Sequence, residues 1–346
     1  DHIDRSLFRN WLNHKGRQLK TSFLRKTCAY AKAEALIRES LSMDRFNMGC
    51  RFEAYLINSL QGNTEAASAV KAEMKSLMHG SVHSYLEYAI DYAAAGMYEE
   101  ATQLLSFLTE EKEAVYPMVY YALGYFASRM GKQDEAVSLY QKAETVCPDY
   151  CFPNKLEEVL MLQDAMKLNP EGAKAPYYLG NFHYAARIYD EAIACWEKSA
   201  SLDDTYPTVL RNLSLAYFNK MNRPDEAVAL LEKAFRLDHT DARVLMELDQ
   251  LYKRLNRPHI ERLCFLEQHI DIVMTRDDLY LEYVTLLNQT GQYREAIRRI
   301  DQRKFHPWEG GEGKVPAQYQ LARLELSKEL INRKKYDDAL ALIDEC

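Results

Sequence analysis

Apolar residues recur three and four positions apart along most of the chain, which is the pattern of α-helices with one buried face. The helical segments come in pairs, and most second segments begin with two polar residues followed by alanine. This motif occurs as Glu99-Glu100-Ala101, Asp134-Glu135-Ala136, Asp190-Glu191-Ala192, Asp225-Glu226-Ala227, Arg294-Glu295-Ala296 and Asp337-Asp338-Ala339. With Ala66 added in front, the alanines lie 35, 35, 56, 35, 69 and 43 residues apart. Most spacings are one or two copies of a period of about 34 residues, which predicts a repeat array.

Each repeat carries the residues that two closely packed helices require. Gly124 and Gly180 occupy a position where a small side chain lets the second helix approach the first. A large residue one turn after the motif alanine, such as Tyr140, fills the remaining space. Glycines between the two helices, such as Gly131, suit a positive φ at the end of the first helix. We expect burial at the helix crossings for Ala101, Ala136, Ala192 and Ala227.

These features resemble the tetratricopeptide repeat, in which two antiparallel helices are joined by a short turn. Six matched motifs over most of the chain carry the resemblance. It implies an all-α fold, a right-handed superhelical solenoid of about eight helix pairs. We place these pairs at 46–78, 81–110, 115–146, 173–202, 207–237, 241–271, 276–303 and 316–346. The sixth pair lacks the alanine motif and is assigned on its apolar periodicity alone.

Two segments interrupt the period. A 56-residue spacing between Ala136 and Ala192 leaves room for one extra helix at about 154–167, where we expect a bend. A Gly-rich stretch follows Phe305, and one long amphipathic helix is predicted at 21–42. The predicted divisions are capping helices at 1–45, a first block at 46–146, a linker at 147–172, a second block at 173–303, a loop at 304–315 and a last, truncated unit at 316–346.

A narrower resemblance covers nearly the whole chain. It rests on the segments Pro148–Pro153, Tyr178–Asn181, Glu247–Leu251 and Phe305–Gly313. Together they look like the repeat region of large bacterial proteins whose N-terminal β-rich domain is similar to carbohydrate-enzyme modules. Because the sequence starts with Asp rather than Met and stops within a helical pattern, we expect it to be part of a longer protein.

Composition and charge exclude several classes of function. The net charge is −7 and no basic stripe is present, which argues against a nucleic-acid partner. No apolar run approaches the roughly 18 to 20 residues of a membrane span. The seven cysteines are scattered, and the pair Cys147 and Cys151 lacks the further ligands of a zinc site. Reduced cysteines favour a cytoplasmic location, with a bacterial periplasm as the alternative.

No catalytic motif is found. The sequence contains no Gly-rich phosphate loop, no zinc-protease helix and no nucleophile elbow. Acidic pairs such as Glu99 and Glu100 lie at helix starts, where the helix dipole already explains them. We therefore expect no enzymatic activity, no cofactor and no metal.

A peptide-binding groove is the first candidate site, because side-chain amides on the first helix of each pair can bond to a peptide backbone. We expect the groove to be lined by Tyr177, Asn181, Tyr184, Asn212 and Arg243. In tetratricopeptide domains that clamp a terminal carboxylate, two such Asn are flanked by cations. Here Tyr177 and Glu247 replace two of those cations, so the expected groove binds backbone rather than a carboxylate. The alternative is that the amides cap helices or bond between repeats.

The second candidate is the loop that contains His306, Trp308, Glu309 and Glu312. One interpretation is that its aromatic residues pack into the final repeats while the glycines turn the chain. The other is a recognition element that offers an aromatic platform and carboxylates, as in many sugar or partner sites.

Three functions remain open from the sequence. The leading hypothesis is a non-catalytic scaffold that binds a protein or peptide in its concave groove. The alternative is an intramolecular spacer or docking module for a carbohydrate-related catalytic domain of the same polypeptide. The third is a catalytic or sugar-binding role of the repeats themselves, which would depend on the Trp308 loop.

Overall fold

The computed structural model describes residues 2–110 and 115–344. Within this part of the chain 76% of the residues are helical and no strand occurs. The two chain ends, on which the expectation of a longer protein rests, lie outside the described residues. The chain divides into two compact units, Asp1–Ile188 and Tyr189–Cys346.

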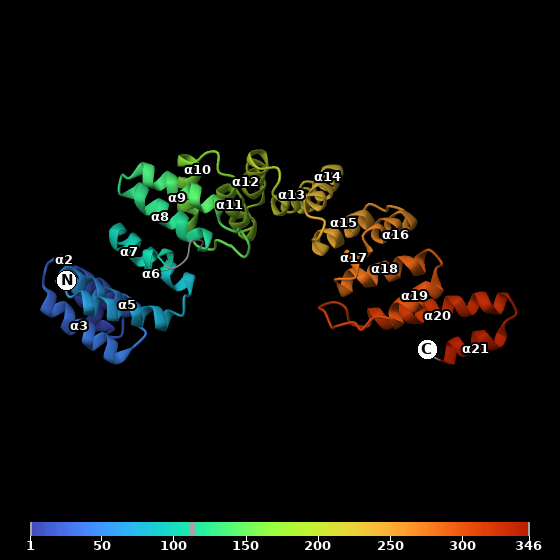
Figure 1. Cartoon of the computed structure of the whole chain (residues 1–346), viewed down its shortest axis with the longest axis horizontal. Coiled ribbons are helices and arrows are strands. Elements are labelled where there is room, and N and C mark those ends of the chain that lie inside the picture. The colour runs from blue at the N-terminus through green and yellow to red at the C-terminus, as the bar shows by residue number, and fades with distance from the viewer. Residues whose placement is uncertain (1, 111–114, 345–346) are drawn as a thin grey trace. The chain divides into compact units, whose positions relative to one another are not determined.

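Unit 1 contains the first eleven helices of the described chain, from the blue end to the green helices in Figure 1. They are α1 (His2–Arg9), α2 (His14–Lys26), α3 (Tyr30–Met43), α4 (Met48–Leu60), α5 (Thr64–Met78), α6 (Val82–Ala94), α7 (Tyr98–Thr109), α8 (Pro117–Arg129), α9 (Gln133–Thr145), α10 (Leu156–Leu168) and α11 (Lys174–Ala185). The expected extra helix is α10, and it packs against α8, α9 and α11.

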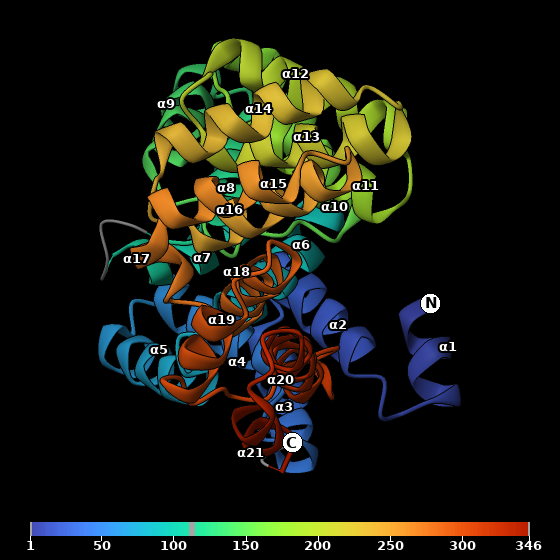
Figure 2. The same cartoon turned by 90° about the vertical axis from the view of Figure 1, so that its right-hand side faces the viewer.

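Unit 2 contains the remaining helices that the structure describes, and its last pair is shown in red in Figures 1 and 2. They are α12 (Tyr189–Leu202), α13 (Pro207–Lys220), α14 (Pro224–Leu237), α15 (Ala242–Arg254), α16 (His259–Gln268), α17 (Ile270–Val273), α18 (Asp277–Gln289), α19 (Tyr293–Asp301), α20 (Lys314–Asn332) and α21 (Tyr336–Asp344).

Within each unit the helices pack as consecutive pairs. The pairs α4/α5, α6/α7 and α8/α9 in unit 1, and α13/α14, α15/α16, α18/α19 and α20/α21 in unit 2, correspond to predicted repeats. An additional pair, α2/α3, precedes them. The boundary between the units falls after Ile188, between the two helices of the predicted pair 173–202. The all-α, helix-pair architecture predicted from the sequence is confirmed.

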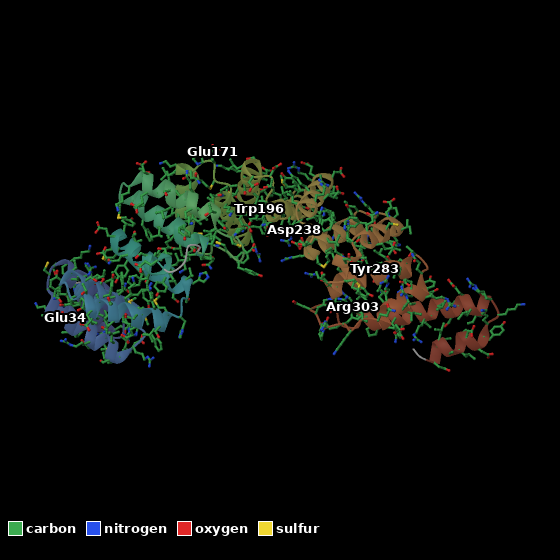
Figure 3. The ribbon with its side chains drawn as sticks, viewed as in Figure 1. Glu34, Glu171, Trp196, Asp238, Tyr283 and Arg303 are labelled. Carbon is green, nitrogen blue, oxygen red and sulfur yellow. The ribbon has the colours of Figure 1, made fainter. Side chains whose placement is uncertain are left out.

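The alanines of the repeat motif lie at the helix crossings as predicted. Ala101, Ala136, Ala192 and Ala227 each have no exposed surface. Trp196, labelled in Figure 3, follows Ala192 by one turn and is also buried.

The crossing of α8 and α9 shows why the small residue is needed. A Cβ atom added to Gly124 would lie 2.4 Å from the Cε1 atom of Tyr140, so the two helices could not approach as they do. The turn glycine Gly131 has a φ of 79°, which glycine adopts without steric cost.

Two local predictions were wrong. In the first repeat Ala66 is exposed and Ala67 is buried, so the motif register there shifts by one residue and the distance to Ala101 becomes one 34-residue period. The single helix predicted at 21–42 is two helices, because the chain turns at Cys28, whose φ is 56°. The amphipathic pattern continues across this turn, so the turn could not be recognised from the pattern of apolar residues.

The sixth pair, which lacks the alanine motif, crosses through a buried charge pair. Arg262 of α16 donates hydrogen bonds from its Nε and Nη2 atoms to the carboxylate of Asp249 on α15, at 3.0 and 2.7 Å. Ser214 and Ala227 meet at the corresponding crossing of α13 and α14, where the Ser214 hydroxyl donates to the Ala227 carbonyl at 2.7 Å. A salt bridge therefore replaces two small residues, and this substitution removed the motif from the sequence.

Candidate binding surfaces

A network of charged and amide side chains joins α13 to α15 in unit 2. The carboxylate of Glu247 accepts a hydrogen bond from Nε of Arg211 at 2.6 Å and from Nε of Arg243 at 3.1 Å. Arg211 also donates to the side-chain oxygen of Asn212 at 3.4 Å. Asn212 and Arg243 are thus linked through Arg211 and Glu247, and the one carboxylate of Glu247 is paired with both guanidiniums.

The start of α15 positions this network. Asp241 caps the helix, because its carboxylate accepts the backbone N–H groups of Arg243 and Val244 at 2.8 and 3.1 Å. Arg243 and Glu247 are four residues apart, so they face the same side of the helix as an ion pair. Glu247 points toward α13, where Arg211 completes the link between the two helices.

A pocket of about 200 Å³ lies beside this network, between α13, α14 and α15. Leu215, Phe218 and Leu251 provide apolar lining, and the guanidinium of Arg254 lies 5.6 Å from the centre of the Phe218 ring. Two side-chain amides, Asn219 and Gln250, also line the pocket. Among the described residues, neither amide has a hydrogen-bond partner, so both can bond to a ligand.

Asn212 was predicted from the sequence, whereas Asn219 and Gln250 were not. Asn219 lies five residues after Ser214 on α13, and Gln250 lies three residues after Glu247 on α15; both line the pocket. For Asn219 the helical period was a usable signal, because it places residues four or five positions beyond Ser214 toward the neighbouring first helix. Gln250 directly follows Asp249, the counterpart of Ser214 in the sixth pair, so this spacing does not identify it. The predicted groove residues were chosen instead by their match to the positions of a carboxylate clamp.

The other groove residues, Tyr177, Asn181 and Tyr184, belong to α11 in unit 1. Asn181 and Tyr184 are half-buried. Tyr177 is only 5% exposed, and its ring centre lies 5.2 Å from that of Tyr178. This burial contradicts the expectation that Tyr177 contacts a ligand. A surface common to Asn181, Asn212 and Arg243 remains a prediction, since these residues belong to different units.

Hydrogen bonds hold the Trp308 loop against the start of α18. The carboxylate of Asp277 accepts hydrogen bonds from the backbone N–H of His306 at 2.9 Å and from Nε of Arg303 at 2.6 Å. Burial raises the pKa of Asp277, but the hydrogen bonds from His306 and Arg303 outweigh burial and hold this pKa below its usual value. Arg303, labelled in Figure 3, also lies 4.4 Å from the centre of the Tyr280 ring.

Trp308 itself is half-buried and packs on its own loop. Its ring lies 6.4 Å from that of Phe305, and a Cβ atom added to Gly311 would lie 2.4 Å from its Cε2 atom. Gly311 is therefore the residue that lets the indole lie against the backbone. Glu309 and Glu312 are exposed. The packing of Trp308 favours the structural interpretation of the loop.

The described part of the chain offers no candidate metal centre. No three His, Cys, Asp or Glu side chains gather there in a way that could hold an ion. Cys147 is exposed, whereas Cys151 is buried, and burial raises the pKa of the Cys151 thiol to about 12. No helix in this part is both long and apolar enough to cross a membrane.

Residues 119–150 match the tetratricopeptide repeat family. The matched segment includes most of α8 and α9, the pair whose crossing depends on Gly124. The pair α8/α9 thus matches a tetratricopeptide repeat, and the other helix pairs belong with it to a repeat arrangement.

The chain is also similar to several solved structures. One MamA structure is 22% identical and covers 54% of this chain and 95% of its own, with a TM-score of 0.25. MamA from Desulfovibrio magneticus RS-1 is 19% identical, and the match covers 56% of this chain and 95% of the MamA chain, with a TM-score of 0.33. PilF from Pseudomonas aeruginosa is 17% identical, and the match covers 75% of this chain and 96% of the PilF chain, with a TM-score of 0.34.

Proposed function

We propose that this chain is a non-catalytic protein-interaction scaffold that binds an extended peptide segment on the α13–α15 surface of unit 2. The observation that carries the proposal is the pocket with an apolar floor and two available amides, Asn219 and Gln250. An extended peptide needs both features: apolar contact for a side chain, and amide groups that pair with its backbone.

The charge arrangement defines which part of a peptide is bound. Arg211 and Arg243 are both already paired with the carboxylate of Glu247, so a terminal carboxylate would have to compete with Glu247 for either guanidinium. The proposed ligand is therefore an internal segment rather than a free C-terminus. The segment belongs either to another protein or to a further domain of the same polypeptide, as the resemblance to bacterial proteins with a carbohydrate-related domain implies.

The test is selection of binding peptides from a random displayed library, followed by affinity measurements with the variants Asn219→Ala and Gln250→Ala. Each lost hydrogen bond is expected to cost about 0.5–1.5 kcal/mol, which is roughly a two- to tenfold loss of affinity. Gln268→Ala is the matched control, because Gln268 is an exposed amide on the second helix of a pair.

Amidating the C-terminus of a selected peptide should leave its affinity nearly unchanged. Collapse of binding upon amidation would show that the surface clamps a carboxylate after all. Peptides that bind equally well to the Asn219→Ala, Gln250→Ala and control variants would place the binding surface elsewhere and refute the proposal.

A further inference from the structure

Two adjoining pockets lie between α2 and α6 in unit 1, and no predicted site residue lines them. Their volumes are about 520 and 340 Å³. Both are lined by Lys15 and Gln18 of α2 and by Asp91 of α6. Because they share these three residues, we treat the two pockets together as the α2–α6 groove; it belongs to unit 1, whereas the surface proposed above belongs to unit 2.

The larger pocket has an excess of acidic side chains. Asp44, Glu87, Asp91 and Glu157 line it, against Lys15 and Lys155. Each lysine is already paired across the pocket, Lys15 with Asp91 at 2.9 Å and Lys155 with Glu87 at 3.0 Å.

The remaining two acids carry the excess charge. Among the described residues, Asp44 and Glu157 have no Lys or Arg partner, and the nearest cationic candidate for Asp44 is His14 at 3.9 Å. A cationic group that enters the larger pocket would therefore meet two carboxylates that lack a permanent counter-charge.

The smaller pocket is apolar. Leu19, Ala94, Ala95 and Met97 line it, and the side chain of Leu19 is 40% exposed. An apolar side chain that entered it would cover surface that now faces water, at a gain of roughly 25 cal/mol per Å². The two pockets are adjacent, so one short segment can reach both.

The walls of the groove are held by buried polar contacts. Arg25 of α2 donates from Nε to the carboxylate of Glu53 on α4 at 2.7 Å, and Tyr92 of α6 donates to the same carboxylate at 2.8 Å. Gln18 is 6% exposed and lies against Gly49, where an added Cβ atom would be 2.2 Å from its side-chain oxygen. These contacts fix α2, α4 and α6, so the groove is formed before a ligand arrives.

We infer that the α2–α6 groove binds a peptide segment in which a Lys or Arg side chain lies near an apolar side chain. The cation enters the larger pocket beside Asp44 and Glu157, and the apolar side chain enters the pocket formed by Leu19, Ala94 and Met97. Lys15 and Asp91 line both pockets. Because Lys15 already pairs with Asp91, Lys15 competes with the ligand cation for this carboxylate.

The test uses the whole chain and short Gly/Ser peptides with blocked termini that carry one Arg and one Leu, at different spacings and in both orders. Fluorescence anisotropy of a labelled series should show binding for a subset of spacings. Replacing Arg by the neutral citrulline in that subset should weaken binding by roughly two- to fivefold, the size expected for a partly exposed charge pair. Binding should also weaken as salt is raised.

Two variants locate the cation. Asp44→Asn keeps an oxygen that accepts the backbone N–H of Phe46, a bond of 2.8 Å, so the fold should persist. Asp44→Asn combined with Glu157→Gln is expected to weaken the Arg peptide and to leave the citrulline peptide unchanged. Glu65→Gln is the matched control, because Glu65 is an exposed acid in the first turn of α5, as Glu157 is in the first turn of α10.

A gain of binding provides the sharpest check. Lys15 is 76% exposed in its side chain, so Lys15→Ala should cost little stability, release Asp91 and tighten the Arg peptide by about threefold. The inference is overturned if no Arg–Leu spacing binds, if citrulline peptides bind equally well, or if the double acid variant behaves as the Glu65 control. The Gln250→Ala variant should bind these peptides normally, which separates this site from the proposed unit 2 surface.

Discussion

The buried pair Asp249–Arg262 allows a sharp test of how the sixth repeat is held together. Asp249 has no exposed surface and Arg262 is 2% exposed. Arg262 also donates to the carboxylate of Glu282 on α18 at 2.7 Å, so one guanidinium joins three helices. The variant Arg262→Met removes the charge and keeps most of the side-chain volume, which separates electrostatics from cavity formation.

We expect Arg262→Met to lower the free energy of unfolding of this region by about 3–5 kcal/mol, because it leaves a buried carboxylate without its counter-charge. The double variant Asp249→Leu, Arg262→Met removes both charges at similar volume. It is expected to lie within about 1 kcal/mol of the natural chain, since an apolar pair replaces a buried ion pair at little net cost. Lys253, which pairs with Glu282 at 2.7 Å in the natural chain, remains in the double variant as the counter-charge of Glu282.

Hydrogen exchange measured on peptides from α15 to α18 reports the local free energy of opening without requiring the whole chain to unfold in one step. Thermal melting of each variant provides the global comparison. A single variant within about 1 kcal/mol of the natural chain, or a double variant as unstable as the single one, would refute the reasoning.

The pH dependence of Arg262→Met follows from the same contact. Burial raises the pKa of Asp249, and the guanidinium of Arg262 opposes that rise. Without Arg262 the folded state should bind a proton on Asp249 more tightly than the unfolded state does. The variant should therefore be least stable at a pH above the pKa that Asp249 has in the folded state. It should regain stability as the pH falls toward the pKa that Asp249 has in the unfolded state.

Two further predictions concern packing. Ala136→Leu should lower the free energy of unfolding by about 1–3 kcal/mol, measured by urea titration, because the alanine has no exposed surface at its helix crossing; a neutral result would mean that the repeat register is wrong. Trp308→Ala should raise hydrogen exchange in residues 303–313 and lower stability by about 1–2 kcal/mol without changing peptide affinity, because the half-buried indole packs on Phe305 and Gly311; lost binding at unchanged stability would instead assign the loop to recognition.

The repeat architecture could be predicted because it depends on local residues at a fixed period. Alanine and glycine at the crossings, and glycine at the turns, are identities that packing and backbone geometry require. Gly124 against Tyr140 is an example in which the motif and the contact coincide.

The candidate surfaces were predicted less well, because they depend on which side chains meet across helices. The structure links Asn212 and Arg243 through Arg211 and Glu247, whereas from the sequence Glu247 was expected only to remove a clamp cation. The structure shows that it also links α13 to α15. The pockets between α2 and α6 had no sequence signal, since Lys15 and Asp91 are separated by 76 positions and form a site only through the stacking of the helices.

The buried pair and the proposed binding surface are two sides of the same helix. Successive residues of an α-helix point about 100° apart, so Asp249 can face α16 while its neighbour Gln250 lines the pocket beside α13. The two hydrogen bonds from Arg262 fix the rotation of α15 about its axis more strictly than two small residues would, because charged hydrogen bonds are directional. On this reasoning the sixth repeat exchanges the usual small-residue crossing for one that sets the orientation of Gln250 and Glu247 toward a ligand.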